Sequence, residues 1–493
     1  MIMSRVSEID RGPLTKTLGG TLRLDSVFSR TRPKARLLIG AVAAALLMSQ
    51  MSGTPVHAEE GTADLEMVSS VAPVGADMPS LEQVRQRFDS GRQLIQPSHL
   101  GDDAVAAMET VGPAASYAPK SPDPSGTAPA PRALSTTTAA AGLYPEPAHT
   151  MTAAECEKGL GRDKKFFIKS RFAVCSGAQF MQTWVRNGTS VGQSSFVLLA
   201  IGTVAKGSRT MEVQYRYTHL DQTGVTGVSG LMITPSVVVP QKWPATAQTH
   251  QGGLIPGAQS WAALKAQPTP GFLHTLTVNK GQGSKPDDTV FAVYQPSVSL
   301  KPTGGWRMTG ALSGTLFFLA PRWDSARYIS SSGGAVFSYV VAMPFSTKAG
   351  AKERLAAQHI KDAYTAPKTT KPVNNAKNLP GLTADRPLTR LYHDAQRRKD
   401  NRNEAIKTCK KYWGNNYASG GKECDEFPFA TTYQGAAQAL KKYDPQQKAS
   451  KDNFSARPIP KEDNGAGGRL MADFYRLNRI IDGSDDGFLI KIT

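Results

Sequence analysis

Cysteine is scarce in this sequence, and the ligand spacings of a zinc site are missing. The 493 residues include four cysteines, Cys156, Cys175, Cys409 and Cys424, with no CxxC pair and no histidine cluster near either couple. These gaps disfavour a structural zinc site, which draws Cys and His ligands from such short spacings. Long apolar runs are scarce as well. The run Leu37–Met48 has twelve residues, whereas a membrane-spanning helix needs about 20, and no other stretch approaches that length.

The first 58 residues have the parts of a secretory signal peptide. Four basic residues between Arg30 and Arg36 come before the apolar run, and a small-x-small cleavage site ends at Ala58. We therefore expect residues 1–58 to be a signal peptide and the mature protein to be secreted, extracellular and without a membrane segment. A retained N-terminal anchor is the alternative.

The cysteines fit an oxidising compartment, because they form two local couples. Three pairings of four cysteines exist on paper, and local pairing is the simplest: Cys156 with Cys175, and Cys409 with Cys424. The second bridge would close a loop of about 15 residues and stabilise the fold by about 3 kcal/mol in the chain-entropy model.

Acidic residues are outnumbered by basic ones. Lys and Arg number 58 against 40 Asp and Glu, a formal net charge of +18. Residues 351–493 hold 26 basic and 17 acidic residues, so much of the excess lies there. Such a balance favours a polyanionic partner such as nucleic acid. The densest cluster, Asp394–Trp413, is either a solvated helix face or a surface that follows phosphates.

Composition divides the rest of the chain into three parts. Residues 59–150 are rich in Ala, Pro, Ser and Thr, which predicts a disordered linker. Residues 151–346 carry short β-branched and aromatic runs; in Thr210–Leu220 the side chains of Met211, Val213, Tyr215 and Tyr217 share one face. This pattern predicts an antiparallel, β-sandwich-like domain, whose role is either binding or structural. An α+β domain is expected over residues 347–493.

Three segments of the last 85 residues carry candidate chemistry. Asp425 and Glu426 open a strand-like run, and Glu462, Asp463 and Asn464 end an extended segment before a glycine-rich stretch. An amphipathic helix follows, with its apolar stripe on Leu470, Phe474, Leu477 and Ile481 and a stop at Gly483. Asp473 lies at the border of that stripe. Asn464 is either the N-cap of this helix or, with Asp473, an oxygen ligand of a divalent cation.

These motifs resemble the NucA/NucB-type deoxyribonuclease family, small secreted bacterial endonucleases. The resemblance rests on "CDEFPFATTYQGA" (residues 424–436), on "EDNGAGGRLMADFYRLNRIIDG" (residues 462–483) and on "HIKDA" (residues 359–363), in the order that the family has. It covers about the last 140 residues. One departure is that Asn464 stands directly before "GAG", one residue closer than in the family pattern.

The resemblance implies a ββα-metal nuclease that hydrolyses DNA non-specifically. Asp425 takes the role of general base, and Glu426, its neighbour in the catalytic motif, should point to the opposite face of the strand. Asn464 and Asp473 would hold Mg²⁺ or Mn²⁺, and Asn478 or Glu462 could share that site. The Cys409–Cys424 bridge would brace the strand. The residues expected to hold DNA are Arg397, Arg398, Lys410, Lys411, Arg469 and Arg476.

Two other functions stay open at this point. One is a cell-surface or wall-binding protein whose nuclease-like domain is inactive. The other is a secreted nuclease toxin, which would have an immunity or inhibitor protein as a partner. The histidines His359 and His393 lie in the same region, but a lone histidine in a helical segment is more often a packing or surface residue than a catalytic one.

Overall fold

The computed structural model describes residues 64–78, 80–83, 86, 144–161, 166–284, 286–310 and 313–493. All of them belong to one compact unit, Thr62–Thr493. The signal peptide expected over residues 1–58 and most of the linker expected over residues 59–150 lie outside the described residues. No described helix is both long and apolar enough to cross a bilayer.

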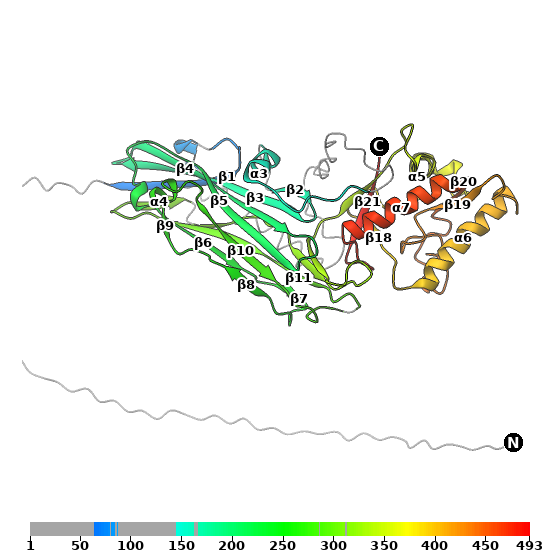
Figure 1. Ribbon diagram of the computed structural model, residues 1–493. Coiled ribbons are helices and arrows are strands. Elements are labelled where there is room, and N and C mark those ends of the chain that lie inside the picture. The colour runs from blue at the N-terminus through cyan, green and yellow to red at the C-terminus, as the bar shows by residue number, and fades with distance from the viewer. Residues whose placement is uncertain are drawn as a thin grey trace, which may run out of the picture. The chain divides into compact units, whose positions relative to one another are not determined.

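The first domain is built on one large sheet (Figure 1). Neighbouring strands run in the order β13-β1-β3-β4-β5-β10-β8, and β2 adds to β3. The bounds are β1 Leu65–Pro73, β2 Phe166–Ser170, β3 Ala173–Arg186, β4 Thr189–Val204, β5 Thr210–Gly224, β8 His250–Gly253, β10 Gly271–Thr277 and β13 Arg307–Gly310. Apart from the parallel pair β1–β13, the pairs are antiparallel.

Two smaller sheets complete this domain. One has the order β16-β15-β11-β7 and the other β14-β12-β6-β9. Their bounds are β6 Met232–Val238, β7 Lys242–Trp243, β9 Gln259–Ser260, β11 Val290–Ala292, β12 Gln295–Lys301, β14 Ser313–Thr315, β15 Pro321–Asp324 and β16 Gly334–Phe337. Short helical segments η1 (Val228–Gly230) and α4 (Trp261–Lys265) lie between strands. The domain is thus predominantly β, as the sequence predicted.

A single apolar core joins these sheets. Met211, Val213, Tyr215 and Tyr217 of β5 are all at most 2% exposed, so the predicted alternation is confirmed. They pack in one cluster with residues of the two smaller sheets. Such packing of sheet against sheet is the sandwich-like feature that the short strands predicted.

Helix α3 (Ala153–Leu160) covers part of the other face of the large sheet. The side chain of Thr152 caps this helix by accepting a hydrogen bond from the backbone N–H of Glu155, and the carboxylate of Glu155 accepts one from the backbone N–H of Thr152. A disulfide joins Cys156 of the helix to Cys175 of β3. The predicted local pairing of these two cysteines is therefore confirmed.

The predicted linker includes a strand of the large sheet. β1 (Leu65–Pro73) pairs with β3 along nine positions and with β13 on its other side, and most of its residues are buried. The expectation of a linker does not hold for this segment. Both faces of β1 are covered by the protein. Its sequence therefore lacks the alternation of apolar and polar residues that marks a strand with one exposed face.

The second domain begins before the expected boundary at residue 347. β17 (Val341–Phe345) pairs in parallel with β21 (Gly487–Ile492), and β18 (Leu388–Thr389) lies on the other side of β21. Met343 and Phe345 of β17 are at most 1% exposed and pack in the core of this domain. The strand therefore belongs to the C-terminal domain.

Helices α5, α6 and α7 surround a two-stranded sheet (Figure 1). β19 (Lys422–Phe427) and β20 (Ser455–Pro460) are antiparallel, and α7 follows β20 directly. The helices are α5 Arg354–Thr365, α6 Ala395–Trp413 and α7 Lys461–Leu477, with a short turn of helix η2 at Pro367–Thr369. A second disulfide joins Cys409 of α6 to Cys424 of β19, which confirms the other predicted pair.

Helix α7 begins earlier and ends earlier than predicted. It starts at Lys461, so Asn464 is in its first turn rather than at its N-cap, and it stops at Leu477 rather than near Gly483. Gly467 lies where α7 packs on its neighbours: a Cβ there would make van der Waals contact, 3.4 Å from Ala356 of α5 and from Phe345 of β17. The helix forms despite the weak helix propensity of its glycines.

The two domains meet at a buried network of charges. Arg171, between β2 and β3, donates to Asp486 at 2.7 Å and to the carbonyl of Asn478 at 2.9 Å. Arg322 of β15 also pairs with Asp486, and Asp324 of the same strand pairs with Arg479. These side chains are at most 7% exposed. The segment that follows α7 is therefore held by arginines of the β domain.

Removing one member of this network should lower the stability of the protein. Replacing Asp486 with alanine leaves Arg171 and Arg322 buried without their shared carboxylate, so the free energy of unfolding should fall by about 3–5 kcal/mol. Urea unfolding of the full chain measures this loss. The matched control is Arg307→Ala, which breaks an exposed ion pair with Asp64 and should cost less than about 1 kcal/mol. Equal losses in both variants would contradict the assignment.

Candidate active site

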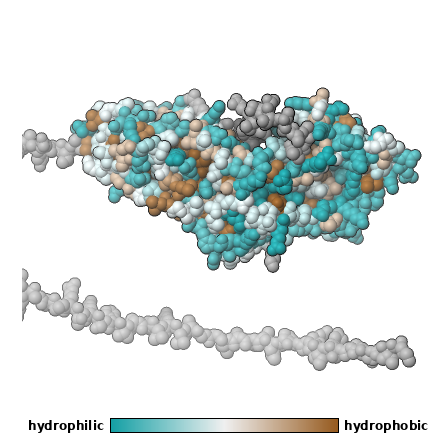
Figure 2. Space-filling view, viewed as in Figure 1, coloured by the Kyte–Doolittle hydropathy of each residue, from teal (hydrophilic) through white to brown (hydrophobic). Residues whose placement is uncertain are grey.

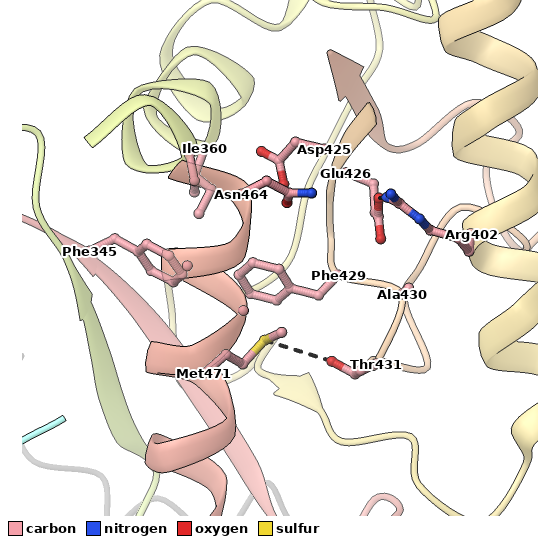
Figure 3. A pocket seen from close by; sticks show the side chains of 13 residues that line it. Phe345, Ile360, Arg402, Asp425, Glu426, Phe429, Ala430, Thr431, Asn464 and Met471 are labelled. Atoms are coloured by element: carbon pink, nitrogen blue, oxygen red, sulfur yellow. Dashed lines mark hydrogen bonds and ion pairs between the residues drawn. The ribbon is translucent and has the colours of Figure 1, made fainter. Parts of the chain in front are cut away.

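A pocket of about 230 Å³ opens between β19, α5 and α7. Asp425 and Glu426 of β19, Asn464 of α7 and Arg402 of α6 form its polar side (Figure 3). Its other side is apolar. The remaining lining residues are Phe345, Ala356, Ile360, Phe429, Ala430, Thr431, Gly467, Gly468 and Met471.

Asp425 is held from behind by a histidine of α5. Its Oδ2 lies 2.7 Å from His359 Nδ1, and His359 Nε2 lies 2.7 Å from Ser455 Oγ on β20. His359 and Ser455 are at most 1% exposed, while Asp425 is 8% exposed. Ser455, His359 and Asp425 therefore form a hydrogen-bonded series that runs from the protein interior to the pocket, where it ends in the carboxylate of Asp425.

The partners of His359 indicate its tautomer. The hydroxyl of Ser455 has no other hydrogen-bond acceptor among the described residues, so it donates to Nε2. Nδ1 carries a proton and donates to the carboxylate of Asp425. This arrangement fixes the orientation of the carboxylate and leaves its Oδ1 without a hydrogen bond from any described residue.

Glu426 points toward α6 instead. It pairs with Arg402, whose guanidinium also donates to the carbonyl of Cys424 (Figure 3). Side chains alternate along a strand, so the side chains of Cys424 and Glu426 lie on one face of β19 and the side chain of Asp425 lies on the other. Burial raises the pKa of Glu426 to about 7, against the effect of Arg402, and the nearby charge of Asp425 adds to the rise.

Asn464 and Glu423 provide further oxygens beside Asp425. Asn464 Nδ2 donates to Glu423 Oε2 at 2.9 Å, which leaves the amide Oδ1 without a partner among the described side chains. Glu423 is two residues before Asp425, on the same face of β19. The described residues contain no group of three or more His, Cys, Asp and Glu that could hold a metal. An amide oxygen with one or two carboxylates nevertheless fits Mg²⁺ or Mn²⁺, which keep several waters.

The structure does not bring Asp473 to this pocket. Asp473 lies nine residues beyond Asn464 on α7, half a turn around the helix axis and about 13 Å along it. It pairs with Arg476 at 2.9 Å. Asn478 donates to the carbonyl of Phe474 outside the pocket, and Glu462 is exposed and does not line it either.

The basic residues expected to hold DNA fall into two groups. Arg397 stacks on Tyr433 and Tyr443, and Arg398 donates to the carbonyl of Tyr392, so both are engaged within the protein. Lys410, Lys411, Arg469 and Arg476 are exposed. The surface around α6 is mostly hydrophilic on the face drawn in Figure 2. Arg402, which was not singled out, is the cation that reaches the pocket.

Sequence reasoning gave His359 too little weight and missed Glu423. A signal for His359 was available in the "HIKDA" segment, on which the resemblance partly rested, yet its partner lies 66 residues away along the chain. Glu423 stands two residues before Asp425, so strand alternation alone could have found it. The other histidine, His393, lies outside the pocket, 3.0 Å from Asp287 of the β domain.

Residues 372–490, which make up most of the C-terminal domain, match the family model described as Deoxyribonuclease NucA/NucB, in the position that the motifs predicted. The match includes β19, β20 and α7 and begins after α5, so His359 lies before it. No curated protein and no solved structure matches the chain.

The raised pKa of Glu426 predicts a pH-dependent stability. The carboxyl group ionises near pH 4.5 when unfolded and near pH 7 when folded, so its contribution is present below about pH 4.5 and is lost as pH rises through about 7. In EDTA, wild type should lose up to about 3 kcal/mol more than Glu426→Gln between pH 4.5 and pH 8. Urea unfolding at both pH values tests this; parallel pH profiles of the two proteins would contradict it.

Proposed function

We propose that the protein is a metal-dependent, non-specific endonuclease that hydrolyses DNA phosphodiester bonds, with Asp425 as the general base. The observation that carries this proposal is that Asp425, a pocket carboxylate in the region that matches the NucA/NucB family model, accepts a hydrogen bond from the buried His359. The β19–β20 pair followed by α7 supports a ββα-type arrangement of the site.

Asp425 removes a proton from the attacking water. Its Oδ2 is occupied by His359, so Oδ1 is the oxygen that accepts this proton. General base catalysis of this kind contributes about 10²–10⁴-fold to a rate. His359 does not contact the substrate. It keeps the carboxylate aimed at the pocket and stabilises its charge through the Nδ1–H bond, which makes it a positioning residue.

Asn464, with Glu423 hydrogen-bonded to it, holds the divalent cation in this proposal. A bound Mg²⁺ or Mn²⁺ would polarise a phosphate oxygen and stabilise the negative charge on the leaving 3′-oxygen. The Asn464–Glu423 bond sets the amide so that its oxygen, rather than its nitrogen, is directed away from Glu423. Asp473 has no part in this ligand set because it lies on another side of α7.

Arg402 and the exposed cations hold the DNA backbone. Arg402 lies in the pocket beside Glu426, where a guanidinium can pair with a phosphate. Lys410, Lys411 and Arg469 extend the positive charge along the surfaces of α6 and α7. Phosphate contacts carry no sequence information, so cleavage is expected at many sequences.

We also propose that the protein acts outside the cell. The basic residues and apolar run before Ala58 support a secretory signal. The two disulfides of the described chain support an oxidising compartment.

If Asp425 is the general base, its replacement should lower kcat strongly, whereas replacement of Asp473 should change kcat little. With Mg²⁺ or Mn²⁺, the full chain should nick plasmid DNA, and EDTA should abolish this activity. Asp425→Asn should lower kcat by about 10²–10⁴-fold because the amide cannot accept the proton. The matched control Asp473→Asn should change kcat less than about threefold, since Asp473 pairs with Arg476 outside the pocket. An Asp425→Asn enzyme as fast as wild type would show that the base is wrong.

The positioning role of His359 predicts a rescue by asparagine. An Asn side chain places its N–H near the position of Nδ1, whereas leucine cannot donate. His359→Leu should therefore lower kcat by about 10–100-fold with little change in KM, and His359→Asn should recover most of that loss. Thermal unfolding separates this effect from a loss of fold. Equal activity in the two variants at equal stability would mean that the hydrogen bond to Asp425 does not matter.

A further inference from the structure

Half of the pocket is apolar, and the proposed hydrolysis does not use that half. Phe345, Phe429 and Met471 form a wall beside Asp425 and Asn464, with Ile360 above it (Figure 3). Phosphates, hydrated cations and the attacking water are all polar. An apolar wall offers them no hydrogen bond. Phe345 is 1% and Phe429 8% exposed, so this wall is the edge of the domain core where the core meets the pocket. The wall therefore fits a different part of the substrate.

Gly468 keeps this half of the pocket open. It is an exposed residue of α7 that lines the pocket, and a Cβ added there would meet nothing within 4 Å. Its neighbour Gly467 faces Ala356 and Phe345, against which an added Cβ would pack at 3.4 Å. Gly468 has no such contact, yet glycine weakens a helix relative to alanine. Empty space beside the wall is what the missing side chain provides.

The size and polarity of this space fit a nucleobase. The whole pocket, its polar half included, has a volume of about 230 Å³, below the roughly 300–1,000 Å³ of pockets for drug-sized ligands, so its apolar half has room for no more than one flat ring system. The nearest hydroxyl on the apolar side, Thr431 Oγ1, is already 3.3 Å from the hydroxyl of Tyr475 and 3.7 Å from Met471 Sδ. Dispersion and stacking on aromatic rings would hold a base here without reading its identity.

We propose that the apolar half of the pocket receives one unpaired nucleobase next to the phosphate that is cleaved. This inference rests on the proposed nuclease activity and adds a substrate preference to it. A base inside a duplex must leave its stack to enter the pocket, which costs free energy, whereas a base of a single strand is already free. The preferred substrate is therefore single-stranded DNA or a duplex site with an unpaired base.

Three substrates test the pocket with the full chain and Mg²⁺: a labelled single strand, its duplex, and the same strand with one abasic nucleotide. Wild type should cut the single strand at least about 10-fold faster than the duplex, measured as kcat/KM. It should cut the bond beside the abasic nucleotide at least about 10-fold more slowly than the same bond of the intact strand.

Gly468→Leu fills the space without a clash of its Cβ. This variant should cut the intact strand as slowly as wild type cuts the abasic bond, and its rate at the abasic bond should stay near that of wild type. The matched control is Ala472→Leu, which adds the same side chain at an exposed position one turn along α7, outside the pocket. It should behave as wild type, and thermal unfolding should show both variants folded.

The outcomes separate the two proposals. No cleavage of any substrate by wild type would overturn the nuclease activity and this inference with it. Cleavage with equal rates at intact and abasic bonds would overturn the base pocket alone. An equal loss at both bonds in Gly468→Leu would also overturn it, because leucine would then be blocking the catalytic centre rather than a base.

Discussion

The hydrogen bond between His359 and Asp425 is the constraint on which the C-terminal domain depends. It joins α5 to β19, and the second ring nitrogen joins both to β20 through Ser455. Three elements distant in the sequence thus meet at one buried ring, which cannot turn without losing a bond. Because α5 also packs on α7 across Gly467, the same ring indirectly sets the distance between Asp425 and Asn464. A polar chain inside an apolar core is tolerated only when every member has a partner, and here each has one.

Local sequence patterns predicted several features of the structure correctly. Strand alternation separated Asp425 from Glu426, and the two short cysteine spacings gave the disulfides that the structure has. The family motifs located the C-terminal domain. The features that were missed depend on tertiary packing: α7 continues through Gly465, Gly467 and Gly468, of which Gly467 faces α5, and both faces of β1 are covered, so its sequence shows no alternation. The partner of His359 lies 66 residues away, beyond any local pattern.

The β domain contacts the segment that follows α7 through buried charges. Arg171 and Arg322 hold Asp486 and the backbone that follows α7, and Asp324 holds Arg479. Buried ion pairs of this kind favour one geometry over others more than they add stability, because a shifted interface would leave a charge unpaired. The β domain therefore acts on the orientation of α7, and through it on Asn464, without supplying any residue of the pocket.

The parallel pairing of β17 with β21 has a consequence for how this fold can be exchanged between proteins. The family match begins at residue 372, but the sheet beneath the pocket takes a strand from Val341–Phe345, and the histidine behind the carboxylate comes from α5. Only three residues, Ser338 to Val340, separate that strand from the last strand of the β domain. Transfer of residues 372–490 alone would carry Asp425 to another protein without His359 and without β17. The structural unit that supports the carboxylate is thus larger than residues 372–490 and includes β17 and α5.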